Sequence, residues 1–302
     1  MKRTSNVFPA VTALLALACA VPIPAGAADG KLLLTGGVSS IDGAAGGGLT
    51  PWALVGSYGS VGQWGATAFL TRVQTRDYSL DAAGIAAGFG ERLELSLARQ
   101  SFATKDTGTA LGAPGLKLKQ NIVGAKLRLL GDAVLDSDSW LPTVAVGVEA
   151  KRLDAGALAP TLVALGASDH GTDLYASATK LFLAQGVLAN VTLRYSRANQ
   201  NGLLGFGGTA HGSASLLPEV SLAWLLRRTI AIGAEYRVKP DKLNPSALGA
   251  GLREDDWKDL FIAWAPNKTV SLTAAYVDLG RIVPAVQKRR QTGGYLSLQL
   301  SY

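Results

Sequence analysis

The sequence predicts an all-β protein, an antiparallel up-and-down β-barrel that spans a membrane with about 14 strands. Three observations support this fold class. Apolar and polar residues alternate along many segments, the connections between these segments are alternately long and short, and the chain ends in an amphipathic strand. Alternation with a period of two gives a strand one apolar and one polar face. Hydrocarbon offers no hydrogen-bond partner to an open sheet edge, so strands that face lipid must close into a barrel.

The amino-terminal 28 residues are expected to be a signal peptide that is removed on export. A short basic start precedes an apolar run over 7–22 and a small-residue cleavage site, with the cut after Ala27 or Ala28. The apolar run is shorter than the about 20 residues that a membrane-spanning helix needs, and prolines interrupt it. We therefore expect two regions, the signal peptide over 1–28 and the barrel over 29–302.

Composition and charge argue against several classes of protein. The only cysteine, Cys19, lies in the expected signal peptide, so the mature chain needs no disulfide. Residues 1–28 hold two of the 29 basic residues and none of the 22 acidic ones, so the mature net charge is +5. No long run of like charge indicates a nucleic-acid surface, and no nucleic-acid partner is expected. No segment after the signal peptide is apolar for long enough to be a membrane helix.

Alternation along the chain identifies the strands in order. The clearest apolar faces are Leu93/Leu95/Leu97, Val123/Ala125/Leu127/Leu129, Val144/Val146/Val148, Val191/Leu193/Tyr195, Val220/Leu222/Trp224 and Ile230/Ile232/Ala234/Tyr236. The expected strands are 31–36, 52–58, 64–72, 81–88, 92–103, 116–130, 141–151, 172–183, 189–198, 217–226, 229–238, 257–264, 269–279 and 293–302. The patterns at 52–58, 81–88 and 257–264 are the weakest, and without two of these strands the barrel has twelve.

The connections distinguish a membrane barrel from a soluble β-sandwich, which alternates equally well. Long connections are expected at 37–51, 73–80, 104–115, 152–171, 199–216, 239–256 and 280–292. Short ones are expected at 59–63, 89–91, 184–188, 227–228 and 265–268, with 131–140 of middling length. Bacterial barrels have an even number of strands, short periplasmic turns and longer external loops. This arrangement predicts one domain with both chain ends on the short-turn side.

The last strand resembles a known type of strand, and this resemblance indicates where in the cell the protein is located. Leu296, Leu298, Leu300 and Tyr302 share one face, and the chain ends on the aromatic residue. This end resembles the closing strand of bacterial outer-membrane barrels, where it is the assembly signal. The resemblance implies the cell outer membrane of a Gram-negative bacterium, with outer-membrane lipid and the barrel-assembly machinery as partners.

Aromatic residues are expected at both membrane interfaces, because a flat apolar ring with a polar tip is partly satisfied on each side. In the predicted topology Tyr58, Trp64, Trp140, Trp224, Trp264 and Tyr302 lie at the periplasmic rim. Trp52, Tyr175, Tyr195, Tyr236, Trp257 and Tyr276 lie near the outer rim. The alternative is that these residues cap strands, as aromatics do in any β protein.

Charged residues on the polar strand faces are the main candidate site, since rings of charge set the ion preference of an aqueous lumen. They are Glu94, Lys126, Arg128, Glu149, Lys151, Arg194, Glu219, Glu235 and Arg237. Their slight cationic excess favours anions. The alternative is that they pair and fill the interior, since about 14 strands fall between filled barrels of about 8 and open ones of about 16–18. The glycine-rich segment 43–48 is either an external loop or folds inward to constrict the lumen, and amino-terminal residues are candidates for an internal plug.

Other candidate chemistry is weak. His211, Ser213 and Glu219 form a His-x-Ser pair with a downstream Glu, which is similar to outer-membrane lipid A deacylases, but Ala214 departs from that motif. Neither histidine has a second ligand at metal-binding spacing, so no metal and no other cofactor is expected. The basic cluster 288–290 in the last long connection is a candidate for gripping lipopolysaccharide phosphates, or it is a solvated loop tip.

Three stretches carry a narrower resemblance: Gly30–Gly37, Gly46–Trp52 and the tyrosine-ended last strand. Together they are similar to a proteobacterial family known only as a domain of unknown function, which implies no activity. The leading hypothesis is therefore a porin-like channel for passive passage of small polar or anionic solutes. The alternatives are a non-conducting barrel whose external loops bind lipopolysaccharide or a partner and, less favoured, a lipid-modifying hydrolase.

Overall fold

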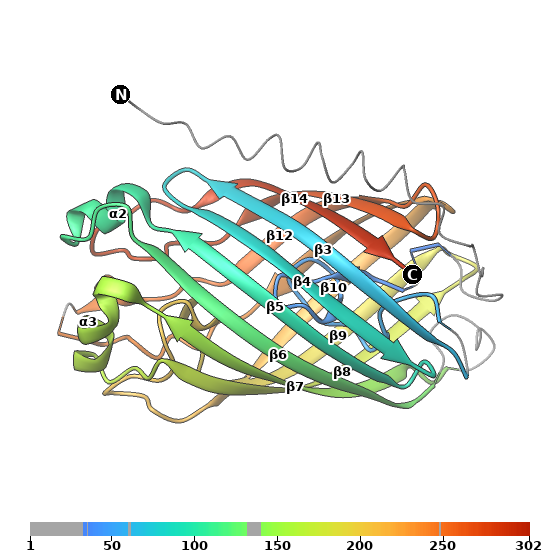
Figure 1. The fold of residues 1–302 in the computed structure, drawn as a ribbon, viewed down its shortest axis with the longest axis horizontal. Coiled ribbons are helices and arrows are strands. Elements are labelled where there is room, and N and C mark those ends of the chain that lie inside the picture. Colours follow the sequence, from blue (N-terminus) through green and yellow to red (C-terminus); the bar gives the residue numbers. More distant parts are fainter. Residues whose placement is uncertain (1–32, 35, 60–61, 132–139, 248) are drawn as a thin grey trace.

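Twelve antiparallel strands close into a single barrel in the computed structural model (Figure 1). The model describes residues 33–34, 36–59, 62–131, 140–247 and 249–302. The expected signal peptide lies outside the described residues. Each wall strand pairs with its neighbours in sequence, and the last strand pairs with the first, which confirms the predicted all-β up-and-down barrel.

The wall strands follow the expected order. They are β3 (Trp64–Thr75), β4 (Ser79–Phe89), β5 (Leu93–Ala103), β6 (Lys117–Leu130), β7 (Thr143–Asp154), β8 (His170–Phe182), β9 (Val187–Ser196), β10 (Ser215–Arg227), β11 (Ile230–Arg237), β12 (Trp257–Trp264), β13 (Val270–Asp278) and β14 (Thr292–Ser301). The connections contain short helices, α2 (Lys105–Ala110), η1 (Gly156–Leu158), α3 (Ala159–Ala164), η2 (Asn199–Gly202) and η3 (Ala250–Leu252). No helix within the described ranges is both long and apolar enough to cross a membrane.

The seam between β14 and β3 closes the barrel. Leu298 pairs with Leu70 in register, and Tyr302 and Ala66 exchange two backbone hydrogen bonds of 2.8 and 2.9 Å. The rings of Tyr302 and Trp64 lie 5.6 Å apart at the same end. The terminal strand therefore leaves no open edge, which hydrocarbon would not tolerate.

The predicted count of 14 wall strands is wrong, and the twelve-strand alternative is correct. Neither 31–36 nor 52–58 belongs to the wall; the second of these lies inside the barrel, and the first is described only at 33, 34 and 36. The reason is that Trp52, Leu54 and Val55 bury their apolar groups against the inner wall rather than against lipid. The connection expected at 73–80 is also shorter, because β3 and β4 extend to leave only residues 76–78.

Side chains alternate strictly across the wall. On β5, Leu93, Leu95 and Leu97 are exposed on the outside, whereas Glu94 and Ser96 point inward and are buried. The other wall strands repeat this pattern, with outward residues that are mostly leucine, valine, isoleucine, alanine and aromatics. An apolar exterior over a polar interior is the arrangement of a barrel that spans a lipid bilayer.

The interior is filled by residues 36–58, which we call the plug. Within it, β1 (Val38–Ser39) and β2 (Ala45–Gly46) are strands of two residues each that pair as a small hairpin, visible inside the barrel in Figure 1. Every residue from 39 to 57 is buried. A side chain at Gly47 would collide with the Glu235 carboxylate, so the plug needs its glycines for close approach to the wall.

Long connections cover the end of the barrel that lies away from the carboxy terminus, and α2 and α3 belong to these connections (Figure 1). Leu203 and Leu204 after η2, Leu243 and Leu252 from the connection 238–256, and Ile282 and Val283 from 279–291 join one apolar cluster. The plug residues Ile41 and Leu49 belong to the same cluster. The lumen is therefore closed from one end by the plug and from the other by the loops.

Candidate functional site

The candidate site is the contact between the plug and the inner wall. Glu94 of β5 accepts hydrogen bonds from two plug amides, Ala45 N at 3.0 Å and Gly56 N at 2.6 Å. Lys126 of β6 donates to the carbonyls of Ala45 and Trp52 at 2.7 and 3.2 Å, and its Nζ lies 3.1 Å from Glu94. Because both wall side chains are almost fully buried, these charges are satisfied by the plug backbone.

Glu235 of β11 holds the middle of the plug. Its carboxylate accepts hydrogen bonds from Leu49 N at 2.8 Å, from Thr50 Oγ1 at 2.6 Å and from Ser221 Oγ at 2.9 Å. Trp52 Nε1 donates to the same Ser221 hydroxyl at 3.0 Å. A single wall carboxylate thus binds one backbone amide and one side-chain hydroxyl of the plug.

The centre of the lumen joins the plug to an external loop. Asp42 of the plug lies 3.0 Å from Arg237 and 3.5 Å from Lys151, and it accepts a hydrogen bond of 2.6 Å from Asn201 of η2. The side-chain oxygen Oδ1 of Asn201 in turn accepts from Lys151 at 2.9 Å and from Arg237 at 2.7 Å. Gln200 and Asn201 have positive φ angles of 45° and 62°, a conformation that Asn tolerates better than most residues. Plug and loop are therefore interlocked by one polar network.

A second network lies on the wall beside it. Arg194 of β9 contacts Glu219 at 2.6 Å, Glu149 at 2.8 Å and Asp173 at 3.4 Å. The Arg194 guanidinium also lies 5.3 Å from the centre of the Tyr175 ring. Four strands, β7 to β10, are thus cross-linked around one buried cation.

A family model described as a protein of unknown function (DUF3034) matches residues 35–299, which is most of the chain. The chain belongs to the DUF3034 family. No curated protein matches this DUF3034 chain significantly.

Solved structures similar to the DUF3034 barrel include outer-membrane proteins. The KdgM porin is 10% identical with a TM-score of 0.49, over 78% of this chain and 99% of that one. The NanC porin is 8% identical with a TM-score of 0.48, over 78% and 98% of the two chains. Outer membrane phospholipase A from Escherichia coli is 12% identical with a TM-score of 0.43, over 83% and 93%. At these values we transfer no function from them.

The nine inward charges expected from the sequence all lie on the inner faces of wall strands of the DUF3034 barrel. Eight of them are almost fully buried, while Arg128 is half-buried near the short-turn end, 3.3 Å from Glu91. Sequence reasoning missed Asp173 and Asp259, which are also buried on the inner face, and Asp42 of the plug. The wall therefore carries six acidic and five basic inward residues, so the cationic excess behind the expected anion preference is absent. Strand alternation could have identified Asp173 as an inward residue, because it lies two residues before Tyr175 and therefore on the same face of β8.

Three expected interface aromatics are inside the barrel, and their prediction is wrong. Trp52 belongs to the plug, while Tyr175 and Trp257 occupy inward positions of β8 and β12; each is at most 5% exposed. The error arises because an aromatic residue near a strand end satisfies the interface pattern whichever face it occupies. Exposed aromatics do lie on the outer surface or at the rims, at Trp64, Trp140, Tyr195, Trp224, Tyr236, Trp264, Tyr276 and Tyr302, and Tyr58 is half-buried.

The expected hydrolase residues are not brought together. His211 and Ser213 are exposed in the connection 197–214, whereas the buried Glu219 is bound by Arg194 and lies 3.1 Å from Arg237. Among the described residues no cluster of three or more His, Cys, Asp or Glu side chains is able to hold a metal ion.

The basic cluster 288–290 is largely engaged within the protein. Arg289 lies 3.3 Å from Asp77, and Arg290 lies 3.0 Å from Asp278. Two of its three cations therefore already have acidic partners, which weakens the cluster as a phosphate-binding site.

A buried pair in the connection 238–256 predicts a pH dependence of stability. Burial raises the pKa of Glu254 from 4.5 to about 7, and burial lowers the pKa of Lys239 to about 7. Glu254 accepts a hydrogen bond of 2.7 Å from Gln200 N, and the Lys239 Nζ lies 3.7 Å from the centre of the Trp257 ring.

We expect the free energy of unfolding to fall as the pH rises from about 4.5 to about 7. The folded protein holds the Glu254 proton more tightly than the unfolded chain. The stability that this proton contributes is fully present below the unfolded pKa of 4.5 and is lost as the pH rises through the folded pKa of about 7. The loss is roughly 3 kcal/mol. Lys239 acts in a separate window above pH 7, where its lowered pKa makes stability rise with pH. Urea unfolding of the native protein and of Glu254→Gln at pH 4.5 and 7 measures the difference; an equal fall in both would contradict the assignment.

Proposed function

We propose that the protein is a porin-like channel of the Gram-negative outer membrane that is closed in its ground state by its own amino-terminal segment. The observation that carries this proposal is the burial of the plug, whose backbone is bound by Glu94, Lys126 and Glu235 of the wall. Release of the plug would open a path for small polar solutes along a lumen with polar walls. The inward charges are nearly balanced, so we propose no strong preference for anions.

The barrel wall is complete without the plug. This supports the role of the plug as a gate rather than as a structural strand. Every wall strand is paired on both sides without it, since β14 pairs with β3. Plug contacts to the wall are largely made by wall side chains, so departure of the plug breaks no ladder hydrogen bond of the barrel. The charged groups that it leaves would be hydrated, as in a water-filled lumen.

Outer-membrane location is supported by the apolar exterior, by the closed barrel and by the terminal aromatic strand. Leu296 and Tyr302 are well exposed on the outer surface, where the assembly machinery would recognise them. Binding of lipopolysaccharide by the external loops belongs to the second candidate below.

A permanently closed barrel is the second candidate, and one observation favours it. The external loops form an apolar cluster with Ile41 and Leu49, so the lumen is sealed by more than the plug. In that case the loops alone would carry the function, through binding of a partner.

Deletion of residues 36–58 should separate the two candidates. In planar lipid bilayers the full mature chain is expected to be silent, and the deletion variant is expected to show discrete current steps. Retained heat-modifiable migration shows that the variant is folded. A folded deletion variant that stays silent, also when residues 198–207 are shortened, would reject the channel.

A further inference from the structure

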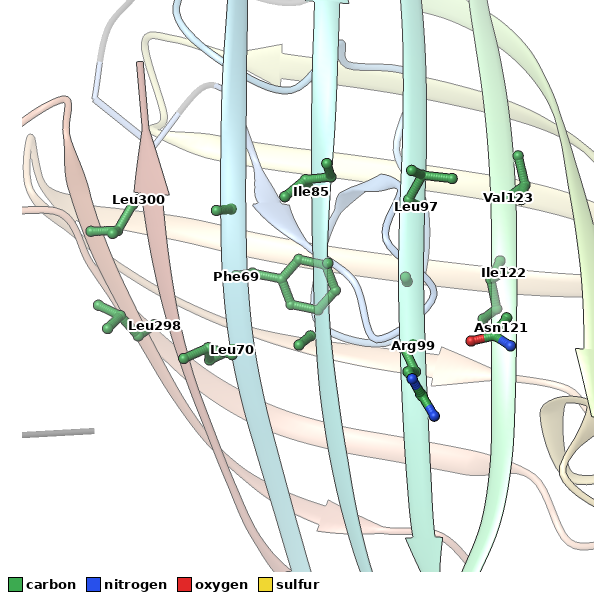
Figure 2. A pocket seen from close by; sticks show the side chains of 14 residues that line it. Phe69, Leu70, Ile85, Leu97, Arg99, Asn121, Ile122, Val123, Leu298 and Leu300 are labelled. Carbon is green, nitrogen blue, oxygen red and sulfur yellow. The ribbon is translucent and has the colours of Figure 1, made fainter. Parts of the chain in front are cut away.

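A groove crosses the outer, lipid-facing wall over five adjacent strands, from β14 through β3, β4 and β5 to β6. It is an open hollow of about 580 Å³ that follows two registered rows of outward side chains. Ala68 pairs with Ile85, and Ala83 pairs with Leu70, so two small side chains alternate with larger ones along the groove. Figure 2 shows Leu70, Ile85 and Leu97 around it. Such a volume lies within the range of about 300–1,000 Å³ found for small-molecule sites, and its apolar lining suits hydrocarbon chains.

One end of the groove is cationic. Arg99 of β5 pairs in register with Asn121 of β6, which pairs with Arg152 of β7, and all three side chains are exposed. Figure 2 shows Arg99 and Asn121 side by side at the edge of the groove. Lys119 stands two residues from Asn121 on the same outer face. Directly opposed and diagonal side chains on a sheet lie about 5–8 Å apart, so the three cations surround Asn121.

Acidic residues lie near these cations on the same outer face. Within the described ranges no salt bridge involves Arg99, Lys119 or Arg152, although Arg152 helps to lower the pKa of the exposed Asp169 carboxyl, whose hydrogen bond to His170 is the main cause. Asp154 stands directly opposite Lys119, and Asp81, which is paired with Arg72, is diagonal to Arg99. The cluster of three cations therefore keeps a net positive charge.

Arg99 lies at the upper edge of the apolar outer face. On β5 it follows the outward Leu93, Leu95 and Leu97. Several outward residues in the same row and the next one on the neighbouring strands are polar, namely Asn121, Arg152 and the ion pair of Arg72 and Asp81. The cations therefore stand where the apolar groove meets the polar rim of the barrel, a position that suits a ligand with both acyl chains and negative charge.

We propose that this groove binds lipid A, the phosphorylated and multiply acylated glycolipid of the outer leaflet, with an acyl chain over Ala68 and Ala83 and a phosphate held by Arg99, Lys119 and Arg152. The cations lie toward the long-loop end, which faces the outer leaflet in bacterial barrels. Arg binds phosphate with two parallel hydrogen bonds, and Asn121 adds a neutral donor. The inference rests on the outer-membrane location but not on whether the lumen opens.

Native mass spectrometry of the folded mature protein in detergent tests the proposal with three lipids: bisphosphorylated lipid A, its dephosphorylated form and phosphatidylglycerol. We expect lipid A to bind most tightly. The variant Arg99→Gln/Lys119→Gln/Arg152→Gln should weaken lipid A binding at least about tenfold. Filling the groove with Ala68→Leu/Ala83→Leu should weaken it too, while Lys258→Gln on the exposed face of β12 is the control and should not.

Three results would overturn the proposal. Unchanged lipid A binding by the triple variant would exclude the cation cluster. Equal binding of dephosphorylated lipid A would exclude phosphate recognition. Equal binding of phosphatidylglycerol, lost in the triple variant, would mean that the site takes anionic phospholipid instead. Because the changed side chains face lipid, the folded state of each variant is checked by heat-modifiable migration before binding is compared.

Discussion

Replacement of both Glu94 and Glu235 by alanine should convert the silent barrel into a conducting one. These two carboxylates accept four hydrogen bonds from the plug, from Ala45, Gly56, Leu49 and Thr50. A hydrogen bond to a charged group contributes about 1.5–3 kcal/mol, so the closed state should lose roughly 6 kcal/mol or more. A change of about 5.5 kcal/mol is enough to move a two-state equilibrium from 1:99 to 99:1.

The measurement is single-channel current, and a reversible lock provides the matched control. Thr50 Oγ1 of the plug and Ser221 Oγ of β10 lie 2.5 Å apart, close to the sulfur–sulfur distance of about 2.05 Å in a disulfide. In the same alanine background, Thr50→Cys/Ser221→Cys should be silent when oxidised and should conduct after reduction. The mature chain brings no competing thiol, since Cys19 lies in the expected signal peptide. Current that is independent of the redox state would mean that the plug is not the gate.

Loss of the buried Arg194 cation should be the most destabilising single substitution in the wall. Arg194→Met leaves Glu149, Asp173 and Glu219 with only Lys151 and Arg237 as neighbouring cations. Removing one partner of a buried ion pair costs about 3–5 kcal/mol, because the remaining charge is uncompensated. Urea unfolding of the refolded protein in lipid vesicles, followed by tryptophan fluorescence, measures this loss.

Two further variants identify the cause. Arg194→Met/Glu219→Met removes a charge of each sign and should recover part of the lost stability, because a buried pair replaced by apolar side chains is often neutral in effect. Arg253→Met removes an exposed cation and should change stability by no more than about 0.5 kcal/mol. A double variant less stable than Arg194→Met would show that packing, not unpaired charge, sets the cost.

The sequence alone predicted the wall of the barrel well. Leu93, Leu95 and Leu97 opposite Glu94 required one lipid face and one polar face, and that requirement holds wherever the strand lies in the wall. The alternation of long and short connections predicted the up-and-down order of the wall strands. The inward position of Arg194 and Glu235 followed from the same period of two.

The fate of residues 36–58 was decided by tertiary structure. The sequence pattern of a strand at 52–58 is the same whether Trp52 faces lipid or the inner wall, because lipid and this part of the inner wall are both apolar. The amides of Ala45 and Leu49 find their acceptors in Glu94 and Glu235, 49 and 186 residues away in the chain. Local periodicity holds no information about partners so distant, so the sequence determined the wall of this protein and only the closed barrel decided that its lumen is filled.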